Sequence, residues 1–280
     1  MKVLVTGAAG MLGRDVVRTA RAANHEVVAL ARDELDLLRG RAVRETLRRE
    51  LPDAVVNCAG WTDVDGAEAD ERAATELNGD AAGTLAAAAA EVGASIVHPS
   101  TDYVFDGSAG RPYVETDPTS PVNAYGRSKL AGEHAVAAVN PRHFVVRTSW
   151  LFGVGGRNFV DTMLGLGSAG GPVLVVRDQV GCPTFTGHLA DALVRLLDGE
   201  SYGLHHIAGD GECSWFEFAN AIFAQAGVDT RAMSCTSEEF PRPAARPPYS
   251  VLRTERPYGF VLPPWEEGLA GYLAERAVAR

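Results

Sequence analysis

Lysine, cysteine and long apolar runs are all scarce in this chain. Its four cysteines among 280 residues are too few and too scattered for a disulfide framework, and no pair has the spacing of zinc ligands. No apolar run reaches the roughly 18 residues of a membrane span, and the first residues lack the pattern of a signal peptide. The sequence therefore predicts a cytoplasmic protein with no membrane partner.

An excess of positive charge is also missing. Thirty-six acidic residues against 26 basic ones give a formal net charge of −10. Because few cations are available to neutralise phosphates, we expect no nucleic acid as the main partner, although a local basic pocket stays possible. Only Lys2 and Lys129 among the 26 basic residues are lysines. Because arginine is the usual basic residue of this chain, a lysine at a given position calls for a specific explanation.

What the sequence does contain is a regular alternation of strand and helix patterns. Apolar runs without polar alternation predict strands covered on both faces, and the longer segments between them predict helices. This order predicts an α/β fold with a doubly wound parallel sheet, the Rossmann type. Strands are expected at 2–6, 25–31, 53–60, 94–101, 143–153, 172–179 and 203–209, and helices at about 11–22, 39–50, 67–92, 128–139, 188–199 and 215–227.

The rhythm loosens after about residue 150, which suggests two domains. We expect an NAD(P)-binding Rossmann domain over 1–150 and a smaller C-terminal α/β domain for the substrate over 151–280. Segments at about 180–200 are expected to return to the first domain. The stretch 238–265 is rich in proline and aromatic residues. Because long irregular segments in compact domains are usually functional, it predicts a loop wrapped over a site.

A glycine-rich turn follows the first strand directly and opens the first helix. Gly7, Gly10 and Gly13 lie in GAAGMLG, a Gly-x-x-Gly-x-x-Gly spacing that differs from the Gly-x-Gly-x-x-Gly of ordinary dehydrogenases. Glycines at these positions allow a tight turn and close approach of the backbone to a pyrophosphate, which the helix N-terminus attracts. The turn predicts a dinucleotide cofactor.

The end of the second strand chooses between the two nicotinamide cofactors. An acid there binds the ribose 2′-hydroxyl, whereas an arginine suits a 2′-phosphate. Ala31 occupies the position of the acid and Arg32 follows it, which favours NADPH, while Asp33 keeps NADH open. Asp36 and Leu37 could flank the adenine. The alternative for Arg32 is a solvated surface cation.

Tyr125 and Lys129 stand four residues apart at the start of a predicted helix, which places both on one face. A tyrosine titrates near pH 10. A neighbouring ammonium stabilises the phenolate, so the phenol can act as a general acid near neutral pH. Upstream, Thr101 ends a predicted strand, where it could bind a substrate carbonyl and share a proton with Tyr125. A helix-surface pair and an ordinary turn are the alternatives.

These residues together resemble the extended short-chain dehydrogenase/reductase family and, within it, the dTDP-4-dehydrorhamnose reductases. The matching stretches cover nearly the full length in order: VTGAAGMLG, DAVVNCAGWTDVDGAE, STDYVFDG, ETDPTSPVNAYGRSKLAGE, VVRTSWLFG, VRDQVGCPT and PAARPPYSVL. The resemblance implies NAD(P)H-dependent reduction of the 4-keto group of dTDP-4-dehydro-6-deoxy-L-mannose to dTDP-L-rhamnose. It implies a catalytic set of Thr101, Tyr125 and Lys129, cofactor contacts at Gly10, Met11, Leu12, Ala31, Asp36, Leu37, Gly60, Trp61 and Thr62, and substrate contacts at Asp102, Trp150 and Arg246.

The charge of such a substrate agrees with this assignment. An acidic protein must meet a nucleotide diphosphate with a few well-placed cations, and Arg246 in the proline-stiffened AARPP is the first candidate for a pyrophosphate clamp. Arg157 is the second. Trp150 offers a flat apolar wall for a deoxysugar. The alternatives are two surface arginines and a core tryptophan.

Two departures from the family pattern concern metals. Some members bind magnesium through glutamates at a dimer interface, but here Asp15 and Gly187 stand at two of those positions. We therefore predict no metal, and the chain could be a monomer or a homodimer. His205 and His206 lie in a predicted strand, which points them to opposite faces and excludes joint chelation. His98 is expected in the core.

Competing functions share this fold. Dehydratases need an acid–base pair after the threonine, typically Asp-Glu, whereas this chain has Asp102 and Tyr103, which favours simple ketone reduction. Related reductases act on other dTDP-4-keto-sugars, as in dihydrostreptose formation. Other relatives are regulatory subunits of methionine adenosyltransferase, although a complete Thr–Tyr–Lys set argues against an inactive homologue. The natural sugar stays open at this stage.

Overall fold

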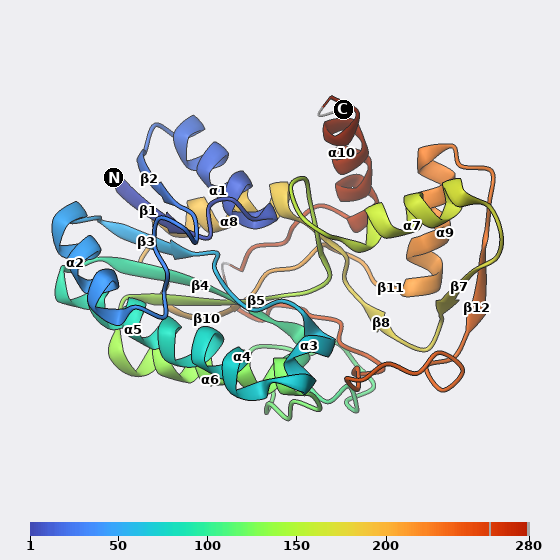
Figure 1. Ribbon diagram of the computed structural model, residues 1–280, viewed down its shortest axis with the longest axis horizontal. Coiled ribbons are helices and arrows are strands. Elements are labelled where there is room, and N and C mark those ends of the chain that lie inside the picture. The colour runs from blue at the N-terminus through green and yellow to red at the C-terminus, as the bar shows by residue number, and fades with distance from the viewer. Residues whose placement is uncertain (258, 279–280) are drawn as a thin grey trace.

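The computed structural model describes residues 1–257 and 259–278. At its centre lies a six-stranded sheet with the order β10-β5-β4-β3-β1-β2, in which all neighbours pair in parallel (Figure 1). The strands are β1 (Lys2–Thr6), β2 (Glu26–Leu30), β3 (Ala54–Asn57), β4 (Ser95–Thr101), β5 (His143–Thr148) and β10 (Gly203–His206). The predicted doubly wound α/β fold is confirmed.

Helices cover both faces of this sheet, which explains why its strands are apolar throughout. On one face, Val3 and Val5 pack in a core with side chains of α1 (Met11–Ala22) and α8 (Thr186–Leu196). On the other face, Leu4 packs with α2 (Gly40–Glu50), α5 (Ala82–Glu91) and α6 (Ala124–Val139). Burying each large apolar side chain contributes roughly 1.5–3 kcal/mol, so both layers stabilise the sheet.

The prediction of a single helix over 67–92 is wrong. The chain instead forms α3 (Val64–Ala69), α4 (Glu71–Thr75), a π-helical segment η1 (Glu76–Ala81) and α5. Asp70 breaks the helix because its backbone has a φ of −145°, and its carboxylate caps α4 by accepting a hydrogen bond from the amide of Ala73. Acidic and small polar residues favour such N-caps over helix interiors.

Two other predicted boundaries also shift. The helix expected at 128–139 begins earlier, at Ala124, because the Asn123 side chain caps it and accepts a hydrogen bond from the amide of Gly126. The strand expected at 143–153 is interrupted after Thr148. Trp150 has a φ of +47°, in the left-handed region, which ends the strand before the short β6 (Leu151–Phe152).

The C-terminal part has its own apolar core and small sheets. Its helices are α7 (Phe159–Ala169), α9 (Trp215–Ala226) and α10 (Trp265–Val278). Its strand pairs are β7 (Val173–Val176) with β12 (Ala232–Cys235), β8 (Val180–Gly181) with β11 (Cys213–Ser214), and β6 with β9 (Thr184–Phe185). The helix before residue 227 ends as expected at Gly227, which has a φ of +66°. Within the described ranges, no helix has the length and apolarity to cross a membrane.

Two elements that follow residue 150 belong to the central layers. Helix α8 packs on α1, and β10 pairs with β5 at the edge of the six-stranded sheet (Figure 1). The division of the chain at residue 150 stays a prediction. Between β12 and α10 the described residues, 236–257 and 259–264, have no helix or strand, as expected for the stretch 238–265 up to the start of α10 at Trp265. We call residues 242–253 of this segment the strap.

Candidate active site

The structure brings the three predicted catalytic side chains together at the carboxyl edge of the sheet. Thr101 is the last residue of β4, and Tyr125 and Lys129 lie on the first turns of α6. The Thr101 hydroxyl lies close enough to the half-buried Tyr125 phenol to influence its pKa. The Lys129 ammonium donates to the carbonyl of Pro99, 2.7 Å away, and is thereby held beside β4.

Burial shifts the titration of both ionisable groups. It raises the pKa of the Tyr125 phenol above its usual range, and the charge of Asp102 adds to this rise, while the Thr101 hydroxyl opposes it. The phenol is therefore protonated at neutral pH. Burial lowers the pKa of Lys129 to about 8, and the charge of Glu133 opposes that shift. Lys129 therefore stays mostly charged at pH 7.

A buried ion pair, which the sequence did not reveal, joins helix α6 to strand β5. Arg147 on β5 donates from Nε and Nη2 to the Glu133 carboxylate, at 2.9 and 2.7 Å, and Ser100 donates to the same carboxylate at 2.6 Å. Both charged side chains are less than a tenth exposed. The signal in the sequence is an arginine within an otherwise apolar strand and a glutamate four residues after Lys129.

Asn78 is a second residue that the sequence analysis missed. It lies in the π-helical segment η1, and its side chain accepts from the amide of Trp61 at 2.8 Å and donates to the hydroxyl of Ser128 at 2.9 Å. It thus connects the loop predicted to contact the cofactor with the catalytic helix. Such π-bulges often occur at functional sites, and no local pattern in the sequence revealed this one.

The glycine turn has the geometry that a pyrophosphate needs. Gly7 has a φ of +62°, and a side chain there would meet the amide nitrogen of Ala59 at 2.6 Å. A side chain at Gly13 would lie 2.2 Å from the Gly7 carbonyl oxygen. Gly10 caps α1 without a side-chain hydrogen bond, so the first amides of the helix are available to an anion. These residues fit a dinucleotide.

The other predicted cofactor residues lie around this turn, although not all face outward. Met11 and Leu12 begin α1, but the Leu12 side chain packs in the core, as does that of Leu37. Only the backbones of these two leucines can therefore serve a ligand. Gly60 and Thr62 flank Trp61, Ala31 follows β2, and Asp36 pairs with Arg39 at 3.7 Å. Arg32 is exposed, and it makes no ion pair with any residue of the described ranges.

Trp150 is held by a second tryptophan on the substrate side of the cleft. Its ring stacks on that of Trp215 with centroids 3.5 Å apart and planes 5° from parallel. Gly181 lies against the same ring, where any added side chain would come within 2.5 Å. These neighbours explain how a tryptophan keeps a left-handed backbone. Trp215 was missed because only the fold brings it to Trp150.

Asp102 is enclosed between two hydroxyl groups. Thr101 donates to its Oδ1 at 3.0 Å, and Ser250 of the strap donates to its Oδ2 at 2.5 Å. Burial raises the pKa of Asp102 to about 7, although both hydroxyls oppose the rise. The carboxyl therefore exists in both protonation states near neutral pH. Ser250 was not singled out from the sequence.

Arg246 is paired within the protein rather than free. Its guanidinium contacts Asp65 of α3 at 2.6 Å and is largely buried. It also lies beside Tyr103, whose ring meets that of Tyr125 edge-on with centroids 6.1 Å apart. Arg157, the second candidate, is exposed and makes no ion pair within the part of the chain that is described.

The side chains examined as metal ligands are otherwise engaged. The Asp15 carboxylate is paired with Arg18, 2.9 Å away, and Arg18 also pairs with Glu275 at 2.7 Å. The arginine thus provides the positive charge beside these two carboxylates. His205 and His206 bond to different carbonyls, those of Ser201 and Arg253. His98 is buried and bonds to Asn57, in the core as expected. In residues 1–257 and 259–278, no group of three or more potential ligands could hold a metal ion.

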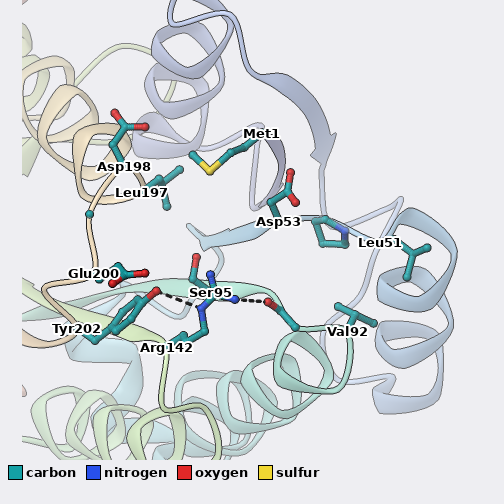
Figure 2. A pocket seen from close by; sticks show the side chains of 13 residues that line it. Met1, Leu51, Asp53, Val92, Ser95, Arg142, Leu197, Asp198, Glu200 and Tyr202 are labelled. Carbon is teal, nitrogen blue, oxygen red and sulfur yellow. Dashed lines mark hydrogen bonds between the residues drawn. The ribbon is translucent and has the colours of Figure 1, made fainter.

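A cavity of about 410 Å³ lies at the opposite, amino edge of the sheet (Figure 2). Asp53, Ser95, Arg142, Asp198 and Tyr202 are among the residues that line it. Arg142 crosses it to hydrogen-bond with the Tyr202 hydroxyl and the Gly93 carbonyl. None of the predicted site residues borders this cavity.

Known proteins resemble this chain over almost its whole length. Residues 1–278 match the family model described as the RmlD substrate binding domain. A dTDP-4-dehydrorhamnose reductase from Burkholderia thailandensis is 43% identical over 285 residues, with 95% of each chain covered. A dTDP-4-keto-6-deoxy-D-glucose reductase from Streptomyces niveus is 45% identical over 251 residues, which covers 89% of this chain and 87% of the relative. The structure of a dTDP-4-dehydrorhamnose reductase from Bacillus anthracis str. Ames in complex with NADP has a TM-score of 0.95 at 36% identity and covers 98% of this chain and 99% of that one.

Proposed function

The chain belongs to the RmlD family of dTDP-4-dehydrorhamnose reductases, and we propose that Thr101, Tyr125 and Lys129 carry out its chemistry. It is an NADPH-dependent oxidoreductase that reduces the 4-keto group of dTDP-4-dehydrorhamnose to give dTDP-L-rhamnose. The observation that carries the residue assignment is the convergence of a buried lysine, a protonated tyrosine and a threonine hydroxyl at one edge of the sheet.

The residues around the glycine turn would hold the cofactor. The free amides at the start of α1 suit its pyrophosphate, and Gly7, Gly10, Met11 and Leu12 form the backbone around them. Exposed Arg32 is available to a 2′-phosphate. When bound, NADPH supplies the hydride that reduces the sugar carbonyl.

Tyr125 acts as the general acid of the reduction. As negative charge develops on the 4-oxygen of the sugar, the Tyr125 phenol donates its proton, and the Lys129 ammonium stabilises the phenolate that remains. Thr101 lies beside the phenol and would bind the same sugar oxygen, which would align donor and acceptor. Burial and the charge of Asp102 both raise the pKa of Tyr125. The positive charge of Lys129 is therefore proposed as the group that stabilises the phenolate and makes the proton available.

The substrate side supplies the remaining contacts. Asp102 lies next to Thr101 and can bind a sugar hydroxyl, and the stacked Trp150 forms an apolar wall. Arg246 is the cation for the pyrophosphate of the nucleotide. The expected partner is therefore a dTDP-4-keto-sugar.

A second sugar is a specific alternative, because the Streptomyces niveus relative is named for dTDP-4-keto-6-deoxy-D-glucose. A turnover assay tests both functions at once, with each dTDP-4-keto-sugar supplied with NADPH and with NADH. We expect the highest kcat/KM for dTDP-4-dehydrorhamnose with NADPH. A higher value for the other sugar would transfer the function to it, and no NADPH oxidation with any sugar would support a regulatory role instead.

A further inference from the structure

One carboxylate anchors the strap to the cofactor-binding half of the molecule. Asp65 Oδ1 accepts from Arg246 Nη1 at 2.6 Å and from the Ala244 amide at 3.2 Å. Its Oδ2 accepts from Arg242, at 2.5 Å from Nη2 and 3.0 Å from Nε. Although burial opposes it, hydrogen bonds from both arginines and Ala244 hold the pKa of Asp65 well below its usual range. Asp65 is therefore charged at any physiological pH.

The charges of this arginine clamp (Asp65, Arg242 and Arg246) leave one net positive charge. Asp65 and Arg246 are 18% and 15% exposed, whereas Arg242 is 52% exposed. The more buried arginine is thus oriented by the carboxylate, and the exposed one compensates that carboxylate from outside. Two arginines that share one carboxylate retain N–H donors that an anionic group can use.

The contacts of Arg246 leave part of its guanidinium available. Both hydrogen bonds to Asp65 and to the Ala244 carbonyl come from the same nitrogen, Nη1. A guanidinium carries five N–H donors in a fixed fork, so holding one nitrogen fixes the direction of the others. Asn123, the cap of the catalytic helix, also holds the strap by donating to the Ala245 carbonyl at 2.8 Å. The strap around Arg246 is thus held by two elements: α3, which follows the loop predicted to contact the cofactor, and α6, which carries Tyr125 and Lys129.

From these contacts we infer that Asp65 is a positioning residue for substrate binding, which orients Arg246 toward the pyrophosphate of the nucleotide sugar. The inference rests on the proposed function of Arg246 as the pyrophosphate cation. Asp65 itself touches no substrate. Its role predicts that affinity for the diphosphate depends on an acidic residue, which a simple count of charges would not suggest.

The test is titration of dTDP and of thymidine into wild type, Asp65→Asn, Arg246→Ala and the double variant. We expect Asp65→Asn to raise the Kd of dTDP about tenfold, within the range for residues that share one hydrogen-bond network. Thymidine affinity should stay unchanged because it lacks the pyrophosphate. With the keto-sugar substrate, KM should rise by the same factor while kcat changes little.

Asp117→Asn is the matched control. Asp117 also pairs with an arginine that is about half exposed, Arg111, and accepts from a backbone amide, that of Val114, but it lies outside the clamp. This variant should leave dTDP affinity unchanged. If Asp65→Asn weakened thymidine as much as dTDP, or lowered kcat and melting temperature without raising KM, Asp65 would be merely structural.

The double variant separates the two hypotheses. If Arg246→Ala leaves dTDP affinity unchanged, the proposed role of Arg246 is wrong. If Arg246→Ala weakens dTDP but Asp65→Asn does not, the pyrophosphate cation stands and the positioning role falls. A gain in affinity in Asp65→Asn would mean that Asp65 competes with the substrate for Arg246. We expect the double variant to bind no worse than Arg246→Ala, because Asp65 acts through that arginine.

Discussion

The proposed catalytic residues and the proposed substrate contacts, here called the catalytic half and the substrate half of the site, are built in different ways. Thr101, Tyr125 and Lys129 come from one strand and one helix, and they rest on a buried ion pair between Glu133 and Arg147. The substrate half joins segments far apart in the chain through stacked rings and ion pairs. Regular elements hold reacting groups rigidly, whereas contacts between loops can change without disturbing them. This difference predicts that substitutions in the substrate half can change sugar preference while the fold is retained.

We expect the largest loss of activity when the proposed general acid, Tyr125, is removed. Tyr125→Phe should lower kcat on the order of 10²–10⁴-fold, the usual contribution of a general acid. Stopped-flow or steady-state NADPH oxidation measures it, and dTDP affinity should stay at the wild-type value. Tyr113→Phe, which removes another buried phenol, serves as the control. Near-normal turnover in Tyr125→Phe would refute the assignment.

The support beneath the catalytic half is tested by Glu133→Gln. Removing one partner of a buried pair leaves Arg147 uncompensated and should lower the free energy of unfolding by about 3–5 kcal/mol. Because the charge of Glu133 raises the pKa of Lys129, its loss should also lower that pKa below about 8. Turnover, which needs the ammonium, should then decline at a lower pH than in wild type. Urea unfolding and a pH–rate profile check the two effects, and an unchanged profile would exclude the coupling.

Arg32, an exposed cation outside both halves, should have a smaller effect, and only on cofactor binding. Arg32→Ala should weaken NADPH binding by about 1–3 kcal/mol, the range for a hydrogen bond to a charged group, and leave NADH nearly untouched. The exposure of Arg32 places the expected value near the lower limit. Fluorescence titration with both cofactors measures it. Equal losses for NADPH and NADH would show that Arg32 does not bind the 2′-phosphate.

The substrate half should respond to loss of its stacked pair. Trp215→Leu removes an aromatic contact that contributes about 0.5–1.5 kcal/mol beyond burial, and it frees Trp150. We expect KM for the nucleotide sugar to rise a few-fold with little change in kcat, together with loss of the near-ultraviolet circular dichroism of the coupled rings. Trp265→Phe is the control for a buried tryptophan outside this pair. A fall in kcat without a rise in KM would contradict the division into two halves.

The sequence predicts the catalytic half far better than the substrate half. Strand patterns, the glycine turn and the Tyr125–Lys129 spacing are local signals, and the structure brings those residues together. The partnership of Asp65 with Arg246 joins residues 181 positions apart, which no local pattern can reveal. The same reason hides Trp215, Ser250 and the Glu133–Arg147 pair. The family resemblance therefore predicts substrate residues, but no local pattern predicts the neighbours that hold them.

The differences between the predicted and observed helices and strands also have local physical causes. Asp70 lies within a stretch otherwise favourable to helix, but its side chain can satisfy the amides of a new helix start, so the chain breaks there. Trp150 has no sequence feature that announces a left-handed backbone. Its conformation costs energy locally and is maintained by Trp215 and the bare backbone of Gly181.

Helix α8 and strand β10 come late in the sequence, which has a consequence for folding during synthesis. Val3 and Val5 leave the ribosome early, yet Leu189 and Leu193, which cover them, emerge only after most of the chain has been synthesised. The open edge of β5 likewise waits for Gly203–His206. When synthesis has reached residue 150, α1 covers this apolar face but α8 does not, and the edge of β5 is unpaired. Both features invite aggregation or chaperone binding.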